Sequence, residues 1–198
     1  MNDEIPLFPL NTVIFPDGLL PLRIFETRYL DMARDCARDD TGFGVVLTKP
    51  MMQKESASIH KVGTLCIISN WERLSDGLLG ITAIGQKRFE IKTQSSLENS
   101  LSIAQVSYLE EMQETQLPDE FSNFKSLLSD IIDKAGVLYA GRKKRYTDAG
   151  WVGARLIEFL PIDISIKQNL LEIDDYMVRL YHLKDEIDKN GYHRVKKG

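Results

Sequence analysis

The sequence predicts an α+β protein in which a β-rich N-terminal half is followed by an all-α C-terminal half. In the first half, short runs rich in Ile, Val, Leu and Thr alternate with glycine-containing turns. In the second half, apolar residues recur at helical spacing. An acidic, glutamine-rich joint at 110–118 separates the two patterns. We therefore expect one domain at 1–117 and a second domain at 118–198.

The first element is an extended arm punctuated by four prolines, IPLFPLNTVIFPDGLLPLRIFETRY at 5–29. Proline fixes φ and donates no backbone hydrogen bond, so a helix is excluded across most of this run. We expect two strands, Ile5–Leu10 and Leu19–Ile24, joined by a turn at Pro16-Asp17-Gly18. The apolar side chains of the arm require burial, so the rest of the protein should pack over it.

An amphipathic helix follows the arm and ends before Gly42. Its expected buried face consists of Phe25, Tyr29, Met32 or Ala33, and Cys36. Further strands are expected at 45–48, 62–74, 78–84, 88–92 and 101–109. Asp76-Gly77 predicts a hairpin between the runs 62–74 and 78–84. Gly85 is expected to break the second of these apolar runs, so that 88–92 forms a separate strand. Short strands at this spacing predict a small barrel or folded sheet with the helix lying across it.

Four helices are expected in the second half. The apolar stripe of the first, which should end near Gly136 or Gly141, consists of Phe121, Phe124, Leu128, Ile131 and Ala135. The second should begin after an N-cap at Thr147 and stop at Pro161. A capping box of Ser165 and Gln168 should open the third. The apolar stripe of the last helix consists of Ile173, Met177, Leu180, Leu183 and Ile187. On its surface we expect the ion pairs Asp175/Arg179 and Asp185/Lys189.

Composition and charge argue against several classes of function. The formal net charge of -4 is unlike that of a dedicated nucleic-acid binder, which carries a basic excess. No apolar segment approaches the roughly 20 residues that span a bilayer, so no membrane partner is expected. The start of the chain, Met1-Asn2-Asp3-Glu4, is acidic where a secretory signal would be basic. These observations predict a cytoplasmic protein.

Motifs for metal, cofactor or covalent chemistry are missing from the sequence. The histidines His60, His182 and His193 lie far apart, and none forms a Cys/His pair at ligand spacing. Cys36 and Cys66 are expected to be small buried side chains in a reducing cytosol. Neither a Gly-x-x-x-x-Gly-Lys-Ser/Thr loop nor a Gly-x-Ser-x-Gly elbow is present. We therefore predict no catalytic, metal-binding or cofactor-binding residue.

Four separated patches, which together extend over nearly the whole chain, carry a resemblance to a known family. They are Pro6-Leu7-Phe8-Pro9-Leu10 with Val13, Phe15-Pro16, Pro21-Leu22, Ile24-Phe25-Glu26 and Arg28-Tyr29; Lys61-Val62-Gly63-Thr64; Gly85-Gln86-Lys87-Arg88-Phe89; and Lys167-Gln168-Asn169-Leu170-Leu171-Glu172. In this order they resemble the N-terminal domain of the Lon ATP-dependent proteases. The resemblance implies a PUA-like β pseudobarrel with one helix, followed by a helical bundle. It also implies a substrate-binding module without the ATPase and peptidase domains of the protease.

The resemblance implies a protein- or peptide-recognition module that is not an enzyme. In the Lon family the equivalent domain helps to capture substrate polypeptides and assists assembly. We therefore expect a polypeptide or protein partner, including the proteolysis machinery. The alternative is an adaptor or regulatory protein that binds one specific folded partner. A third function, a small-molecule site in the barrel, lacks convergent polar residues in the sequence.

Trp71 and Trp151 are the candidate polypeptide-binding residues. They could form walls of an apolar groove at the junction of the two domains, or they could be ordinary core residues. Glu26 either caps the first helix or contacts a ligand. The basic segment Arg142-Lys143-Lys144-Arg145 is either a solvated loop or a contact for an acidic partner or phosphate. The sequence makes no prediction of the oligomeric state.

Overall fold

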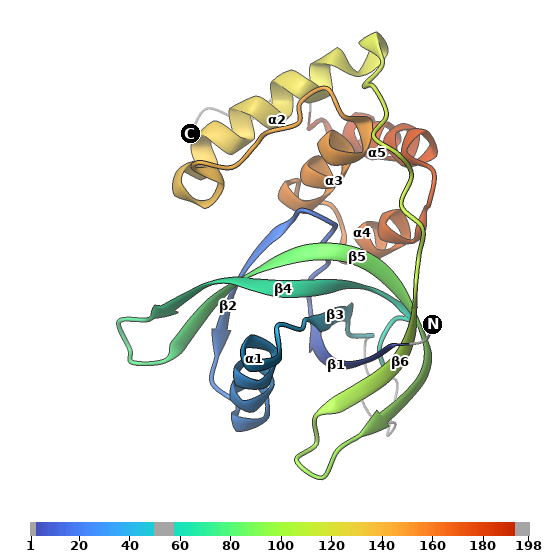
Figure 1. Cartoon of the computed structure of the whole chain (residues 1–198). Coiled ribbons are helices and arrows are strands. Elements are labelled where there is room, and N and C mark those ends of the chain that lie inside the picture. Colours follow the sequence, from blue (N-terminus) through green and yellow to red (C-terminus); the bar gives the residue numbers. More distant parts are fainter. Residues whose placement is uncertain (1–2, 50–57, 193–198) are drawn as a thin grey trace. The chain divides into compact units, whose positions relative to one another are not determined.

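The computed structural model describes residues 3–49 and 58–192 (Figure 1). The chain divides into two compact units, Met1–Glu110 and Glu111–Gly198. In the described residues, the first unit contains six strands and one α-helix, and the second contains four α-helices and two short 3-10 helices. Strands thus precede helices along the chain, and the class is α+β as predicted.

The first unit is built on a mixed sheet. Its strands are β1 (Asp3–Leu10), β2 (Leu19–Ile24), β3 (Phe43–Leu47), β4 (Val62–Arg73), β5 (Leu79–Ser96) and β6 (Ser102–Tyr108). They are ordered β2-β5-β4-β3-β1-β6, and β6 pairs a second time with β5. β1 and β3 are parallel, while the other pairings among the described residues are antiparallel. β5, β4, β3, β1 and β6 therefore form a closed circuit of hydrogen-bonded strands, here called the strand ring.

Both strands predicted in the proline-rich arm are present. β2 has the predicted bounds, and β1 begins at Asp3 rather than Ile5. The prediction that Gly85 breaks a strand is wrong, because β5 runs through this residue without interruption. A Cβ atom at position 85 would lie 2.2 Å from the carbonyl oxygen of Phe15. Glycine is therefore needed here for the close approach of the arm to the strand.

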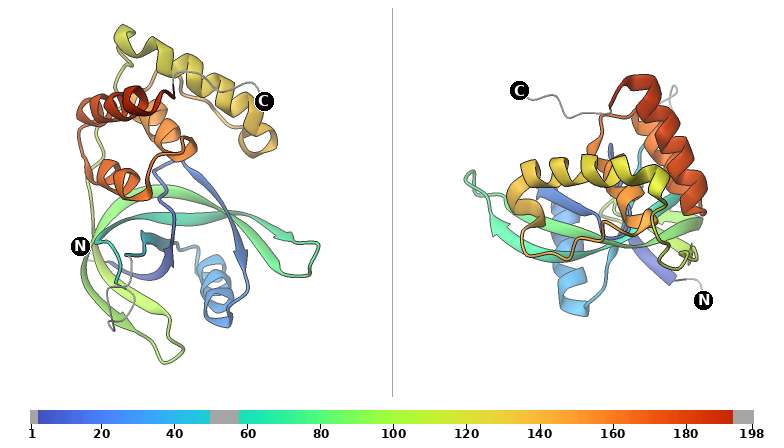
Figure 2. Two further views of the ribbon diagram at one scale, coloured as in Figure 1. Left: turned by 180° about the vertical axis from the view of Figure 1, so that it is seen from behind. Right: turned by 90° about the horizontal axis from the view of Figure 1, so that it is seen from above.

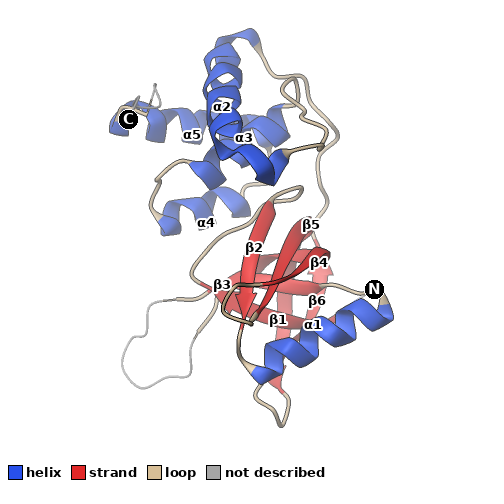
Figure 3. Ribbon diagram, turned by 90° about the vertical axis from the view of Figure 1, so that its left-hand side faces the viewer, coloured by secondary structure: helices blue, strands red, loops and turns tan. Residues whose placement is uncertain are grey.

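Two apolar cores lie on opposite faces of the sheet, because successive residues of a strand face opposite sides. One core combines side chains of four ring strands: Ile5, Leu7, Val46, Phe89, Ile91, Ala104 and Val106. The other lies under helix α1 (Thr27–Asp39) and includes Phe8, Tyr29, Met32, Cys36, Phe43, Cys66 and Ile81. Figures 1 and 3 show α1 lying along this side of the sheet. The arm is thus buried by its own sheet and by α1.

Helix α1 ends as predicted but begins differently. Its C-cap, Asp40, adopts the left-handed conformation with φ 51°, just before Gly42. Its buried residues are Tyr29, Met32, Ala33 and Cys36, whereas Phe25 precedes the helix and is 67% exposed. Glu26 occupies the N-cap position, but its side chain makes no capping hydrogen bond. The prediction that Phe25 belongs to the buried face is therefore wrong.

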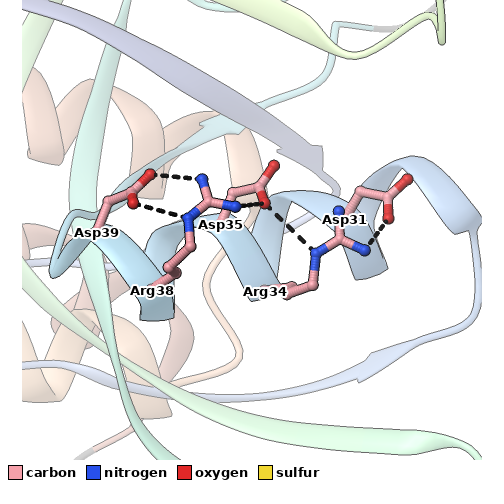
Figure 4. A network of polar contacts seen from close by, with 5 residues as sticks. All are labelled: Asp31, Arg34, Asp35, Arg38 and Asp39. Carbon is pink, nitrogen blue, oxygen red and sulfur yellow. Dashed lines mark hydrogen bonds and ion pairs between the residues drawn. The ribbon is translucent and has the colours of Figure 1, made fainter.

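A ladder of alternating charges covers the outer face of α1 (Figure 4). Arg34 pairs with Asp31 at 2.9 Å, and Arg38 pairs with Asp35 at 2.9 Å. Arg38 also pairs with Asp39 at 2.8 Å, and these hydrogen bonds lower the pKa of the Asp39 carboxyl. Both guanidinium groups are thus occupied by carboxylates of the same helix, as in a solvated surface.

The second unit contains η1 (Asp119–Phe121), α2 (Ser122–Ala135), η2 (Gly136–Tyr139), α3 (Ala149–Phe159), α4 (Ile164–Glu172) and α5 (Tyr176–Asn190). All four predicted helices are present. The sequence predicts that residues 111–117, which precede these helices, belong to the first domain, whereas in the structure they belong to the second unit. It is bound there because the Leu117 N–H donates to the Thr147 carbonyl, and the Ala149 N–H donates to the Thr115 carbonyl, each at 2.8 Å.

Aspartates cap three helices of this unit, and in two of them an aspartate replaces the predicted hydroxyl residue. Asp148, not Thr147, caps α3 and accepts from the Gly150 N–H at 3.0 Å. Asp163, not Ser165, caps α4. The capping box with Gln168 is therefore absent, since the Gln168 amide donates to the Glu172 carboxylate instead. In each case a carboxylate took the role expected of the hydroxyl, one residue after Thr147 in α3 and two residues before Ser165 in α4.

The predicted surface pairs of α5 are wrong. Asp175 is its N-cap and accepts from the N–H groups of Met177 and Val178 at 2.7 and 3.1 Å. Arg179 is buried and donates to the Ile173 carbonyl, and Lys189 pairs with Glu186 rather than Asp185. The stripe predicted for the first helix is confirmed in part. Phe121, Phe124 and Leu128 are buried, but Leu127 and Ile132 are buried in place of Ile131 and Ala135.

Candidate functional site

The sequence Ile24-Phe25-Glu26 and its neighbours line a cleft of about 400 Å³ in the first unit, here called the motif cleft. The cleft lies at the end of the strand ring where β1 and β3 end and β6 begins, since Leu10, Thr48 and Ser102 also line it. Its apolar wall consists of Phe8, Leu10, Leu22, Ile24, Phe25 and Tyr29. The lining thus joins both strands of the proline-rich arm to the start of α1.

A stacked aromatic pair supports the motif cleft. The rings of Phe8 and Tyr29 are stacked with centroids 4.1 Å apart and an angle of 26° between their planes. Burial raises the pKa of the Tyr29 hydroxyl, while the nearby Arg28 guanidinium, 4.7 Å from the ring centroid, acts in the opposite direction. Phe25 lies at the cleft with two-thirds of its surface exposed. The cleft therefore presents a fixed apolar surface with one free aromatic side chain.

The charged groups of the motif cleft are already paired. Arg28 forms an ion pair with Glu26 at 2.6 Å and donates to the Ser100 carbonyl at 3.1 Å. Arg23 pairs with Asp76 of the β4–β5 hairpin. This arrangement suits the binding of apolar side chains, because no charge has to lose a partner when water leaves the cleft.

Trp71 lies on the same sheet face as part of the motif cleft. In the register of the sheet, Ile81 pairs with Leu22 on one side and with Trp71 on the other. Side chains directly opposite one another point to the same face. Trp71 is 43% exposed and lines a second, shallower depression of about 360 Å³ beside the hairpin turn. Figures 1 and 2 show this hairpin extending beyond the neighbouring strands.

Trp151 has a different environment. It lies in α3 of the second unit with only 5% of its surface exposed, and its ring meets that of Tyr146 edge-on at 5.6 Å. The two candidate tryptophans therefore belong to different compact units. In the basic segment, Lys144 lies 3.8 Å from Asp133 and Arg145 lies 3.6 Å from Asp148.

Side chains that could bind a metal ion do not converge in the part of the chain that the structure describes. No three His, Cys, Asp or Glu side chains there are placed to hold a metal ion. His193 lies outside the described residues. Cys36 and Cys66 are buried free thiols, as predicted, and burial raises the pKa of the Cys36 thiol. Within residues 3–49 and 58–192, no helix is both long enough and apolar enough to cross a membrane.

Phe25 is the exposed site residue that sequence reasoning missed. Helical periodicity placed it on the buried face with Tyr29, but it stands before the helix. The useful signal was strand alternation, because Ile24 at the end of β2 is 1% exposed and the next side chain must face the other way.

Comparison with known proteins shows the relationship over most of the chain. The model of the ATP-dependent protease La (LON) substrate-binding domain matches residues 4–189. A crystal structure of a Lon N-terminal domain protein from Xanthomonas campestris aligns with a TM-score of 0.76 and 31% identity, covering 92% of this chain and 98% of that one. The N-terminal domain of the Mycobacterium avium complex Lon protease aligns with a TM-score of 0.65 at 18% identity, covering 97% and 100%, and so shares the fold.

Complete Lon proteases are longer than the region of similarity. The Lon protease of Cytophaga hutchinsonii is 28% identical over 200 residues, which cover 94% of this chain and 24% of that protein. For the Lon protease of Haemophilus influenzae the identity is 24%, over 90% of this chain and 23% of that protein. The chain thus spans about a quarter of the length of these curated relatives. It belongs to the family of the ATP-dependent protease La (LON) substrate-binding domain.

Proposed function

We propose that this chain is a noncatalytic module that recognises unfolded polypeptides in the cytoplasm and is not itself an enzyme. The observation that carries the proposal is the match of a substrate-binding domain model to residues 4–189. The proposal includes the architecture that the family resemblance implies, a PUA-like pseudobarrel followed by a helical bundle. It also includes a connection to the proteolysis machinery, to which the captured polypeptide would pass, and no role in nucleic-acid or membrane binding.

The motif cleft and the neighbouring Trp71 form the proposed polypeptide-binding surface. Phe25 and Trp71 are 67% and 43% exposed, and aromatic side chains are the commonest strong anchors of binding surfaces. Trp71 is the tryptophan to which we assign contact with the polypeptide, while Trp151 serves the packing of α3. A groove at the junction of the two units, also expected from the sequence, stays a prediction.

The expected affinity follows from the size of this surface. Complete burial of one large apolar side chain contributes roughly 1.5–3 kcal/mol, and two anchors therefore contribute a few kcal/mol. Ordering an unfolded segment offsets part of this gain. A dissociation constant of 1 μM requires about 8.2 kcal/mol, so binding should be micromolar or weaker. Weak binding suits a module that passes its polypeptide on, and nucleotide should have no effect on it.

Titration of a fluorescently labelled, permanently denatured protein into the purified chain tests this proposal. We expect saturable binding without nucleotide, and no binding of the same protein in its folded state. A signal that does not saturate would remove the proposal. Affinity capture from the native cytosol separates it from the adaptor function. A mixture of unfolded clients supports polypeptide recognition, whereas one stoichiometric folded partner would favour the adaptor.

A further inference from the structure

A second concave surface lies at the other end of the strand ring, where β1 and β3 begin and β6 ends. It encloses about 700 Å³, and its lining comes from the start of β1, the α1–β3 turn, β4, β5 and the end of β6. We call it the acidic mouth. Concave surfaces at the ends of closed sheets are common ligand sites. It shares no lining residue with the motif cleft.

The acidic mouth has an apolar wall that solvent can reach. Ile67 on β4 is 40% exposed. The partly buried Leu65 and Pro6 line the same surface. The register of β4 and β5 shifts beside this wall, since Leu65 pairs with Lys87 and Cys66 with Gly85, so that Gln86 is an extra residue on β5. A partner with an apolar side chain could therefore cover Ile67.

Charge distinguishes the acidic mouth from the motif cleft. Asp3, Glu4 and Asp40 line the mouth together with a single cation, Lys87, which gives the lining a net charge of −2. The partners of two of the carboxylates are neutral. Glu4 accepts from the Gln105 amide at 2.9 Å, and Asp3 accepts from the Tyr108 hydroxyl. In the motif cleft, by contrast, both arginines are paired with carboxylates.

Among the described residues, the cations near the mouth offset only part of its negative charge. Lys87 places its Nζ atom 5.9 Å from the centroid of the Tyr108 ring. Arg38 at the end of α1 is already bound by Asp35 and Asp39. Asp40 itself stands at the C-terminal end of α1, where the helix dipole adds negative potential. Burial, and after it the charge of the Asp3 carboxylate, raises the pKa of the Tyr108 hydroxyl.

We infer that the acidic mouth binds polypeptide segments in which Lys or Arg stands next to an apolar residue. The aliphatic stem of Lys or Arg would lie against Ile67, with its cationic head among the carboxylates of Glu4 and Asp40. The inference rests on the proposed function and adds to it a preference among polypeptides. The motif cleft accepts apolar side chains of any segment, and the acidic mouth selects those with adjacent positive charge.

Two labelled peptides test the inference. They share a short Leu-containing sequence and differ only in that Gln replaces each Lys of the first. Fluorescence anisotropy should give about fivefold tighter binding of the Lys peptide, which corresponds to about 1 kcal/mol in total from two exposed charge pairs. The preference should shrink as salt is added. Equal affinities at low salt would overturn the inference.

Variants then locate the effect. Glu4→Gln combined with Asp40→Asn should reduce the preference for the Lys peptide to less than about twofold. Asn suits the left-handed conformation of residue 40, so folding should be preserved. The matched control is Glu98→Gln with Asp130→Asn, which removes two exposed carboxylates elsewhere and should leave the preference intact. An equal loss in the control would contradict the assignment to this mouth.

The same experiment separates this inference from the proposed function. If neither peptide is preferred but denatured protein still binds saturably, only the acidic mouth is refuted. If denatured protein and both peptides fail to bind, the proposed function fails as well.

Discussion

The main chain of Gly85 lies directly against the carbonyl group of Phe15, and a Cβ atom on residue 85 would be 2.2 Å from that oxygen. Hydrogen bonds maintain the approach, since the Asp17 N–H donates to the Gly85 carbonyl at 2.8 Å and the Gly85 N–H donates to the Gly18 carbonyl at 3.0 Å. The Thr64 hydroxyl of β4 also donates to the Ile14 carbonyl at 2.6 Å. The turn of the arm is thus fixed to the middle of the sheet.

Gly85→Ala should destabilise the protein by about 1–3 kcal/mol, the usual cost of forcing extra atoms into a packed site. Backbone on both sides of the contact must move, because the obstructing atom is a carbonyl oxygen rather than a flexible side chain. Urea unfolding provides the measurement. Gln86→Ala, at the next and exposed position of β5, is the control and should change stability by less than about 0.5 kcal/mol. Equal stabilities of the two variants would show that the close approach has no energetic role.

Asp175→Ala should lower the free energy of unfolding by about 1 kcal/mol, because two N–H groups at the start of α5 lose their acceptor. Asp175→Asn keeps a side-chain oxygen and should restore most of the loss. Thermal unfolding would measure both changes. Asp185→Ala, an exposed position in the same helix, is the control and should have little effect. A loss in the Asn variant as large as that in the Ala variant would argue against capping.

The Asp163 carboxyl should titrate below its ordinary value. Hydrogen bonds from the Ser165 hydroxyl at 2.5 Å and from the Ser165 N–H at 2.8 Å lower its pKa from 3.8. The folded pKa lies below the unfolded one, so the stabilisation is complete above the unfolded value and is lost as pH falls through the folded value. Ser165→Ala should raise the folded pKa, which carboxyl NMR titration can measure. An unchanged titration would show that the hydroxyl does not hold the carboxylate.

The extended arm could be predicted from sequence because proline acts locally. Pro6, Pro9 and Pro21 restrict φ wherever they occur, so the bounds of β2 follow from the chain itself. The role of Gly85 could not be predicted in the same way, since the contact that requires glycine comes from Phe15, which is remote in sequence. A single sequence does not distinguish a glycine that ends a strand from a glycine that allows another segment of the backbone to pack closely against the strand.

The helix ends show a second limit. Thr147 and Ser165 are good capping residues, but Asp148 and Asp163 stood within two positions and served instead. N-cap propensity alone does not decide which of two neighbouring residues caps a helix. The path of the chain that enters the helix decides it. Phe25 was wrongly assigned to the buried face of α1. It lies between the end of β2 at Ile24 and the start of α1 at Thr27, where the two-residue period of a strand and the 3.6-residue period of a helix give different predictions. Arg28 pairs with Glu26, two residues away, whereas Asp76, the partner of Arg23, is remote in sequence.

Polypeptide binding by a Phe25→Ala, Trp71→Ala double variant tests the central claim most directly. Leu97→Ala is the matched control, because Leu97 is 47% exposed in the same unit but lines neither the motif cleft nor the depression beside Trp71. With labelled denatured protein, the double variant should bind at least about tenfold more weakly than the original chain, and the control should bind equally well. Undiminished binding by a folded double variant would contradict the account.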